Sequence, residues 1–139
     1  MSLPTIFSTL PNKKQRGELA EAEFLARAFR LGFIVSRPWG DSAPYDLIVQ
    51  PCQRLYRIQV KSAWKRVCNR YTIHSSGKNH RRYLARDFEF MAAYVAPYDA
   101  WYIIPKKAVA GRVSINFYPH RKGSQGIYEV FREAWHLLK

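Results

Sequence analysis

Residues 45–61 have the sequence YDLIVQPCQRLYRIQVK, and this stretch decides the fold. Two runs rich in β-branched and aromatic residues, 45–50 and 55–61, flank the short segment PCQR. Runs of this kind, joined by a few turn residues, are typical of two antiparallel strands. The stretch therefore predicts a β-hairpin.

Three polar side chains of this hairpin are expected to converge. Side chains alternate along a strand, so Gln59 and Lys61 share the face opposite the apolar residues of the second strand. A symmetric turn between Cys52 and Gln53 places Asp46 opposite Gln59, and opposed residues have Cβ atoms about 5 Å apart. A slip of one residue would separate the three groups. The hairpin is predicted to gather a carboxylate, an amide oxygen and an ammonium group.

These groups suit the hydrolysis of a phosphodiester. Mg²⁺ prefers oxygen ligands, which Asp46, Gln59 and the backbone carbonyl of Val60 can supply. Such an ion acidifies a bound water and neutralises charge on the phosphate. Lys61 is the candidate to orient or deprotonate that water and to stabilise the transition state. We expect Mg²⁺ as the cofactor, with Mn²⁺ able to replace it.

A helix from Arg16 to Leu31 is predicted before the hairpin and ends at Gly32. Its inward face is predicted to carry four apolar residues: Ala22, Leu25, Ala28 and Phe29. Glu21 falls on that face, where an acid is costly unless a metal or Lys61 pairs with it. Glu18 also lies inward, but stabilisation by the helix dipole in the first turn explains it. Glu21 is the preferred helix carboxylate, and Glu18 is the alternative.

The rest of the chain predicts a single α/β domain over residues 1–139, with a central mixed sheet flanked by helices in the order αβββαβ. Residues 1–13 are expected to form an N-terminal arm, and 125–139 a C-terminal helix with an apolar stripe from 127 to 138. Strands are expected at 33–36, 70–75, 101–104 and 114–118, and one helical turn at 106–110. The segment 70–75 is expected to extend the hairpin, and 88–95 fits a helix or a strand.

Charge points to a polyanionic partner. The chain has 23 Lys and Arg against 10 Asp and Glu, a net charge of +13, and such an excess favours nucleic acid. Between residues 62 and 86 there is no acid, and this segment is predicted to follow the DNA backbone. Its cationic residues are Lys65, Arg66, Arg70, Lys78, Arg81, Arg82 and Arg86. The alternative is a basic loop that is merely solvated.

The sequence does not support a membrane protein, a secreted protein, a zinc protein or a nucleotide hydrolase. No apolar run approaches the roughly 18 residues that span a bilayer, and the N-terminus does not resemble a signal peptide. The two cysteines form no CxxC pair, the four histidines lack zinc-ligand spacing, and no Walker-type glycine loop is present. We expect a cytoplasmic protein without a membrane partner.

Together these motifs resemble the PD-(D/E)xK nucleases of the restriction-endonuclease-like superfamily. Asp46, followed after a dozen residues by Gln59-Val60-Lys61, resembles the motif that names them. Tyr45 stands where a proline usually precedes the aspartate, and Gln59 replaces the acid. Residues 16–21, RGELAE, resemble the start of archaeal Holliday-junction resolvases, whose final Glu belongs to the metal site. That match favours Glu21.

The resemblance covers residues 14–104, as far as a DAWYIIP segment. A cyanobacterial group-I-intron homing endonuclease of this superfamily has the same change from acid to glutamine. The resemblance implies a Mg²⁺-dependent DNA endonuclease that acts on a branched junction or a specific duplex site. Cutting both strands with one site per subunit calls for a homodimer or a higher homo-oligomer. The alternative is a non-catalytic nucleic-acid-binding protein that retains the nuclease fold.

Overall fold

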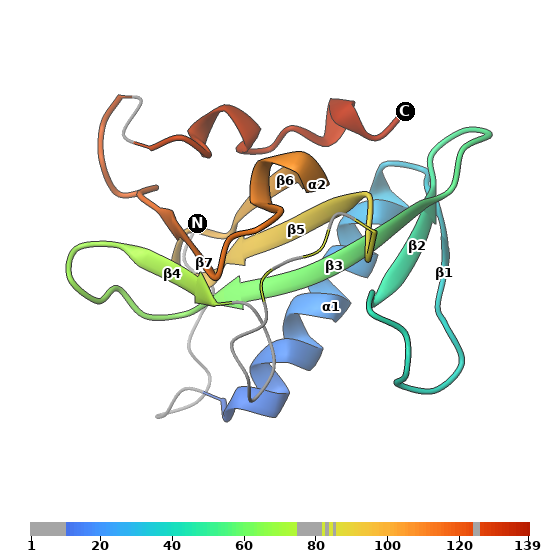
Figure 1. Ribbon diagram of the computed structural model, residues 1–139, viewed down its shortest axis with the longest axis horizontal. Coiled ribbons are helices and arrows are strands. Elements are labelled where there is room, and N and C mark those ends of the chain that lie inside the picture. The colour runs from blue at the N-terminus through green and yellow to red at the C-terminus, as the bar shows by residue number, and fades with distance from the viewer. Residues whose placement is uncertain (1–10, 75–81, 83, 85, 124–125) are drawn as a thin grey trace.

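The computed structural model describes residues 11–74, 82, 84, 86–123 and 126–139. A long helix lies against one face of a five-stranded sheet, and a two-stranded ribbon covers part of the other face (Figure 1). Each face buries its own cluster of apolar side chains, and strand β3 contributes to both clusters. The site described below lies where the helix, β3 and the ribbon meet.

Helix α1 (Lys13–Arg30) begins one turn earlier than predicted. The Asn12 side chain accepts a hydrogen bond from the Gln15 N–H (2.9 Å), and the Gln15 side chain accepts one from the Asn12 N–H (3.0 Å). This capping box satisfies two N–H groups that would otherwise lack partners. Lys13 therefore belongs to the helix and not to the expected arm, while residues 1–10 lie outside the described residues.

Three of the four residues predicted for the inward face of α1 are exposed, and only Ala28 of that set is buried. The helix buries Ala20, Phe24 and Ala28, whereas Leu25 and Phe29 are 36% and 61% exposed. The two small alanines let the helix approach the sheet closely, and the Phe24 ring packs against the rings of Trp101 and Trp135, 5.6 Å from each centroid. Ala22 is exposed as well. Because α1 has apolar residues on two sides, its own pattern could not select the covered one.

The five-stranded sheet has the order β1-β2-β3-β5-β6, in which only β3 and β5 are parallel. Its strands are β1 (Ile34–Ser36), β2 (Leu47–Gln50), β3 (Tyr56–Ala63), β5 (Phe90–Val95) and β6 (Ala100–Pro105). Leu47 pairs with Ile58 and Ile48 with Arg57, which confirms the symmetric hairpin. The α/β class with a central mixed sheet is confirmed.

Strand β5 settles the ambiguous segment 88–95. It lies between β3 and β6 and is covered on both faces, which explains its nearly continuous apolar sequence. At its start, Glu89 forms an ion pair with Arg57 of β3, with a distance of 2.6 Å. The order αβββαβ places a helix between the third strand and the next strand, but the described residues between β3 and β5 contain only strand β4.

Strand β4 (Tyr71–His74) pairs with β7 (Ser114–Phe117) and does not extend the hairpin as predicted. Both edges of β3 are already occupied, by β2 and by β5. Tyr71 and Ile73 instead bury one face of the ribbon on the sheet, beside Ile115 and Phe117. The helical turn predicted at 106–110 is present as α2 (Lys106–Val109).

The predicted C-terminal helix over 125–139 is also wrong. Its described residues, 126–139, contain two single turns of 3-10 helix, η2 (Glu129–Phe131) and η3 (Trp135–Leu137). Between them, Glu133 adopts a positive φ of 51° and donates its N–H to the Trp101 carbonyl (2.7 Å). Its carboxylate accepts from the Trp101 N–H (3.0 Å) and from the Trp135 indole (2.7 Å). These bonds hold the segment along β6 and interrupt a continuous helix.

Over the described part of the chain, no helix has the length and apolar character needed to cross a membrane.

Candidate active site

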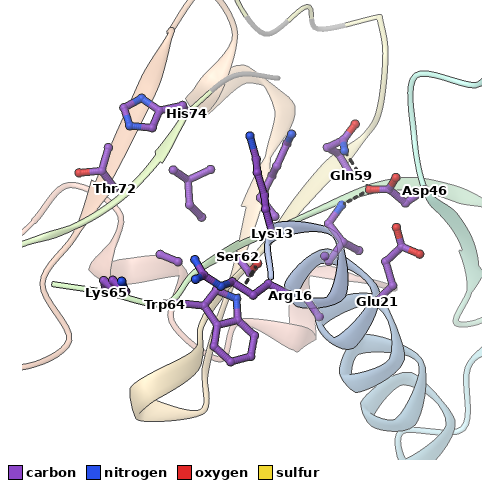
Figure 2. A pocket seen from close by; sticks show the side chains of 16 residues that line it. Lys13, Arg16, Glu21, Asp46, Gln59, Ser62, Trp64, Lys65, Thr72 and His74 are labelled. Atoms are coloured by element: carbon purple, nitrogen blue, oxygen red, sulfur yellow. Dashed lines mark hydrogen bonds between the residues drawn. The ribbon is translucent and has the colours of Figure 1, made fainter. Parts of the chain in front are cut away.

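An open pocket of about 1080 Å³ lies between the first turns of α1, the second half of β3 and strand β4 (Figure 2). It is lined by all five residues predicted to hold a metal or to act in catalysis: Glu21, Asp46, Gln59, Val60 and Lys61. In the sequence, only the resemblance to the nuclease motifs linked the helix to the hairpin. In the structure, both elements line the same cavity.

Asp46 is fixed by the register of the hairpin. Its N–H donates to the carbonyl of Ile58 (2.9 Å). One carboxylate oxygen, Oδ2, accepts hydrogen bonds from Gln59 Nε2 and from the Val60 N–H, both at 2.8 Å (Figure 2). Burial raises the pKa of Asp46, although the Val60 N–H and the charge of Lys61 act against that shift.

Glu21 approaches this group from the helix. Its carboxylate is turned toward Asp46 in Figure 2 and accepts a hydrogen bond from Arg37 at 3.2 Å. Burial, followed by the charge of Asp46, raises the pKa of Glu21, and Arg37 opposes that shift. Glu18 is exposed and does not line the pocket, so the geometry agrees with the choice of Glu21.

Lys61 lies on the same strand face as Gln59. Burial lowers the pKa of its ammonium group; the nearby Lys13 adds to this effect, while Asp46 opposes it. Lys61 forms no ion pair within the described residues. Its amine is therefore available to a molecule in the pocket.

The residues predicted to contact DNA are distributed unevenly. Lys65 lines the pocket, and Arg66, Arg70 and Arg86 are exposed. Arg82 is exposed too, but its guanidinium donates to the carbonyl of Gly111 (2.6 Å). The two remaining residues, Lys78 and Arg81, lie outside the described residues.

Sequence reasoning missed four basic groups near the acids. Lys13, Arg16 and His74 line the pocket, and Arg37 pairs with Glu21. Asn12 and Gln15 form the capping-box pattern that would have placed the helix start before Lys13. No local sequence pattern predicts that Arg37 lies near Glu21, because its position depends on how the loop before β2 folds back toward α1.

Replacing Gln59 by Glu should strengthen metal binding and weaken the metal-free protein. The variant adds a negative charge, which raises the affinity of an oxygen site for a divalent cation. It also exchanges the 2.8 Å hydrogen bond to Asp46 for repulsion between two acids, at a cost of about 1 kcal/mol or more. Titration of Mn²⁺ by calorimetry, and thermal unfolding with a chelator, would measure the two effects.

The control for this variant is Gln50→Glu, which makes the same change on β2, away from the residues that line the pocket. It should leave Mn²⁺ binding as in the wild type. If Gln59→Glu and Gln50→Glu bound Mn²⁺ equally well, Gln59 would not belong to a metal site.

Between α1, β3 and β4, two acids and a lysine without an ion pair among the described residues line one pocket. A protein of restriction-endonuclease-like fold with this arrangement falls in the class of nucleases. A family model described as PD-(D/E)XK endonuclease matches residues 11–138, and the chain belongs to this family. The predicted resemblance is thereby confirmed.

Two solved structures are similar to the structure of this chain. The bacterial homing endonuclease I-Ssp6803I superposes with a TM-score of 0.79 at 28% sequence identity, covering 93% of this chain and 92% of that chain. Archaeoglobus fulgidus Hjc, a Holliday junction resolvase from an archaeal hyperthermophile, gives a TM-score of 0.51 at 18% identity, covering 83% of this chain and 94% of that chain. The second likeness concerns the fold alone. No curated protein sequence matches the chain.

Proposed function

We propose that this protein is a Mg²⁺-dependent endonuclease that hydrolyses phosphodiester bonds of DNA. The observation that carries the proposal is the meeting of Glu21, Asp46, Gln59 and Lys61 in one pocket. Membership of the PD-(D/E)XK endonuclease family supports it. The net charge of +13 supports a nucleic acid as the substrate.

The donors in the pocket fit a hard divalent cation. Glu21, Asp46, the Gln59 amide and the Val60 carbonyl all offer oxygen, which Mg²⁺ prefers. Burial is the main cause that raises the pKa of each acid, and a bound cation would offset that cost by favouring the charged carboxylates. The described residues contain no cluster of three His, Cys, Asp or Glu side chains, so much of the coordination shell would be water. When bound, the ion would acidify a water and offset charge on the phosphate.

The side chains of the pocket have separate roles in the proposed reaction. Asp46 is held by two hydrogen bonds through one oxygen, which leaves its other oxygen free for a ligand. The lowered pKa of Lys61 suits it to accept a proton from the attacking water or to donate a hydrogen bond to the phosphate. Lys13 and Arg16, on the helix side of the pocket, would bind the phosphate oxygens and orient the strand.

Duplex DNA is the proposed substrate. I-Ssp6803I, named as a homing endonuclease, matches this chain over nearly its full length. A branched junction is the second candidate, supported by the resolvase-like RGELAE stretch at residues 16–21. A homodimer or higher homo-oligomer, with one site per strand, is proposed for cutting both strands.

Cleavage is expected in Mg²⁺ or Mn²⁺ and not in a chelator. The substrates would be supercoiled plasmids carrying fragments of the source genome, and a labelled four-way junction. Asp46→Ala should reduce cleavage at least a hundredfold, because it removes a charged oxygen from the metal site, and should still bind DNA. Absence of cleavage with any divalent metal, together with equal binding by wild type and Asp46→Ala, would instead indicate a non-catalytic DNA-binding protein.

A further inference from the structure

The connection between β3 and β4, residues 64–70, projects away from the sheet at the left of Figure 1, and we call it the arm. Its end is a two-residue turn, in which Val67 and Arg70 exchange hydrogen bonds of 2.9 and 3.2 Å. Cys68 and Asn69 have φ angles of 52° and 61°. Two consecutive positive φ values define the type I′ turn, which matches the twist of a narrow hairpin.

The tip of the arm is hydrogen-bonded to a neighbouring turn of the chain. Asn69 Oδ1 lies 3.0 Å from His120 Nε2, so the tip is hydrogen-bonded to the turn that follows β7. Where the arm joins β4, the Tyr71 ring packs edge-on against His120 and against Tyr98, with centroids 5.9 and 6.0 Å apart. These contacts hold an exposed hairpin in one orientation.

The surface of the arm and of the turn beside it is basic. Arg66 and Arg70 are exposed on the arm, and Arg121 and Lys122 are exposed on the neighbouring turn. None of the four forms an ion pair with a described residue. Val67, next to the tip, is 63% exposed. The arm thus presents cations around one apolar side chain.

The arm begins at the wall of the candidate active site. Lys65 lines the pocket together with Thr72 and His74 of the returning strand. Cys68 lies seven positions after Lys61 along the chain, and a fully extended chain of seven steps spans at most about 24 Å. DNA rises about 3.4 Å per base pair, so the tip lies within about seven base pairs of Lys61.

We propose that the arm enters the major groove of duplex DNA, within about seven base pairs of the bond that the pocket cuts. The inference rests on the proposed function and adds where and how the duplex is held. The major groove is about 12 Å wide and admits a two-stranded β-ribbon. Arg66 and Arg70 would contact phosphates or guanine edges, and Val67 is placed to meet a thymine methyl group.

The test compares two variants that lose the same charge. Arg66→Gln/Arg70→Gln removes two cations of the arm. Arg54→Gln/Lys107→Gln removes two exposed cations that do not line the pocket, one of them in the turn at the opposite end of β3. Binding to a labelled 40-base-pair duplex would be measured by fluorescence anisotropy in EDTA at several salt concentrations.

The arm variant should bind about tenfold or more weakly than wild type at 0.1 M salt, and its salt-dependence slope should fall by about two, since each phosphate contact contributes about 0.9. The control variant, Arg54→Gln/Lys107→Gln, should keep the wild-type affinity and the wild-type salt-dependence slope. The arm variant should lose far less affinity for an RNA duplex, because the major groove of A-form helices is too narrow to admit side chains.

The proposal for the arm would be wrong if the two double variants bound the DNA duplex with the same affinity and salt dependence, or if the arm variant lost as much affinity for RNA as for DNA. Neither result would contradict cleavage or the proposed function. If the wild-type protein did not bind the DNA duplex at all, the proposal for the arm would fail, whereas the proposed function would fail only if plasmid and four-way junction also stayed uncut in Mg²⁺ and Mn²⁺.

Discussion

Replacing Lys61 by Met is expected to reduce DNA cleavage at least a hundredfold and to make the protein more stable. The variant removes the amine proposed to act on the attacking water, and groups in that role contribute about 10²–10⁴-fold. Methionine keeps an unbranched apolar chain that can fill the same space. DNA binding should persist, because Lys13, Arg16 and Lys65 still line the pocket.

The stability gain follows from the lowered pKa of Lys61, which burial causes. A lysine whose pKa falls on folding destabilises the native state while it is charged, and this penalty disappears as pH rises from the folded pKa to the unfolded one, near 10.4. The melting temperature should therefore rise by roughly 2–5 °C at pH 7, and the difference from wild type should shrink by pH 10.

Calorimetry at the two pH values, with cleavage assays beside it, would measure both effects. Lys107→Met is the matched control, since Lys107 is exposed on α2, and it should alter neither property. Normal cleavage by Lys61→Met would remove Lys61 from the mechanism.

Replacing Trp101 by Ala should cost about 3–5 kcal/mol of unfolding free energy, the usual range for a buried Trp or Phe. Trp101 is 1% exposed. Its ring stacks on Tyr94 at 4.6 Å and meets Phe24 and Trp135 edge-on at 5.6 and 5.9 Å. It therefore joins β5, α1 and the C-terminal segment. Domains are commonly stable by only 5–15 kcal/mol, so the loss would be a large fraction of the total.

Urea denaturation of Trp101→Ala and Trp39→Ala would check this expectation. The second variant makes the same chemical change at a side chain that is fully exposed, at 101%, and should leave the midpoint nearly unchanged. Similar midpoints for the two variants would show that the aromatic cluster around Trp101 contributes little.

The hairpin and its three polar groups could be predicted because their geometry is local. Alternation along β3 and a turn symmetric about residues 52 and 53 suffice to bring Asp46 to Gln59, and the structure gives this pairing directly. The RGELAE motif favoured Glu21, which does line the pocket, although most of the predicted helix face was wrong. Leu25 and Phe29 suggested a second apolar side, and only the sheet decides which side is covered.

Long-range contacts account for the other differences. Strand β4 pairs with β7, about forty residues away along the chain, and no local pattern specifies that partner. Residues 127–138 have apolar spacing that suits a helix, yet the contacts of Glu133 with Trp101 and Trp135 prevail. Arg37 reaches Glu21 through a loop whose path depends on the whole fold.

The two hydrogen bonds to Asp46 Oδ2 bear on the thermodynamics of the proposed catalysis. Folding alone immobilises this carboxylate, so an arriving ion or phosphate encounters an aspartate with little rotational freedom left to lose. Preorganised groups of this kind spare the transition state the cost of reorientation. In the proposed mechanism, substrate affinity would then depend mainly on Lys13, Arg16 and Lys65 at the pocket wall, and the rate of the chemical step on the hairpin.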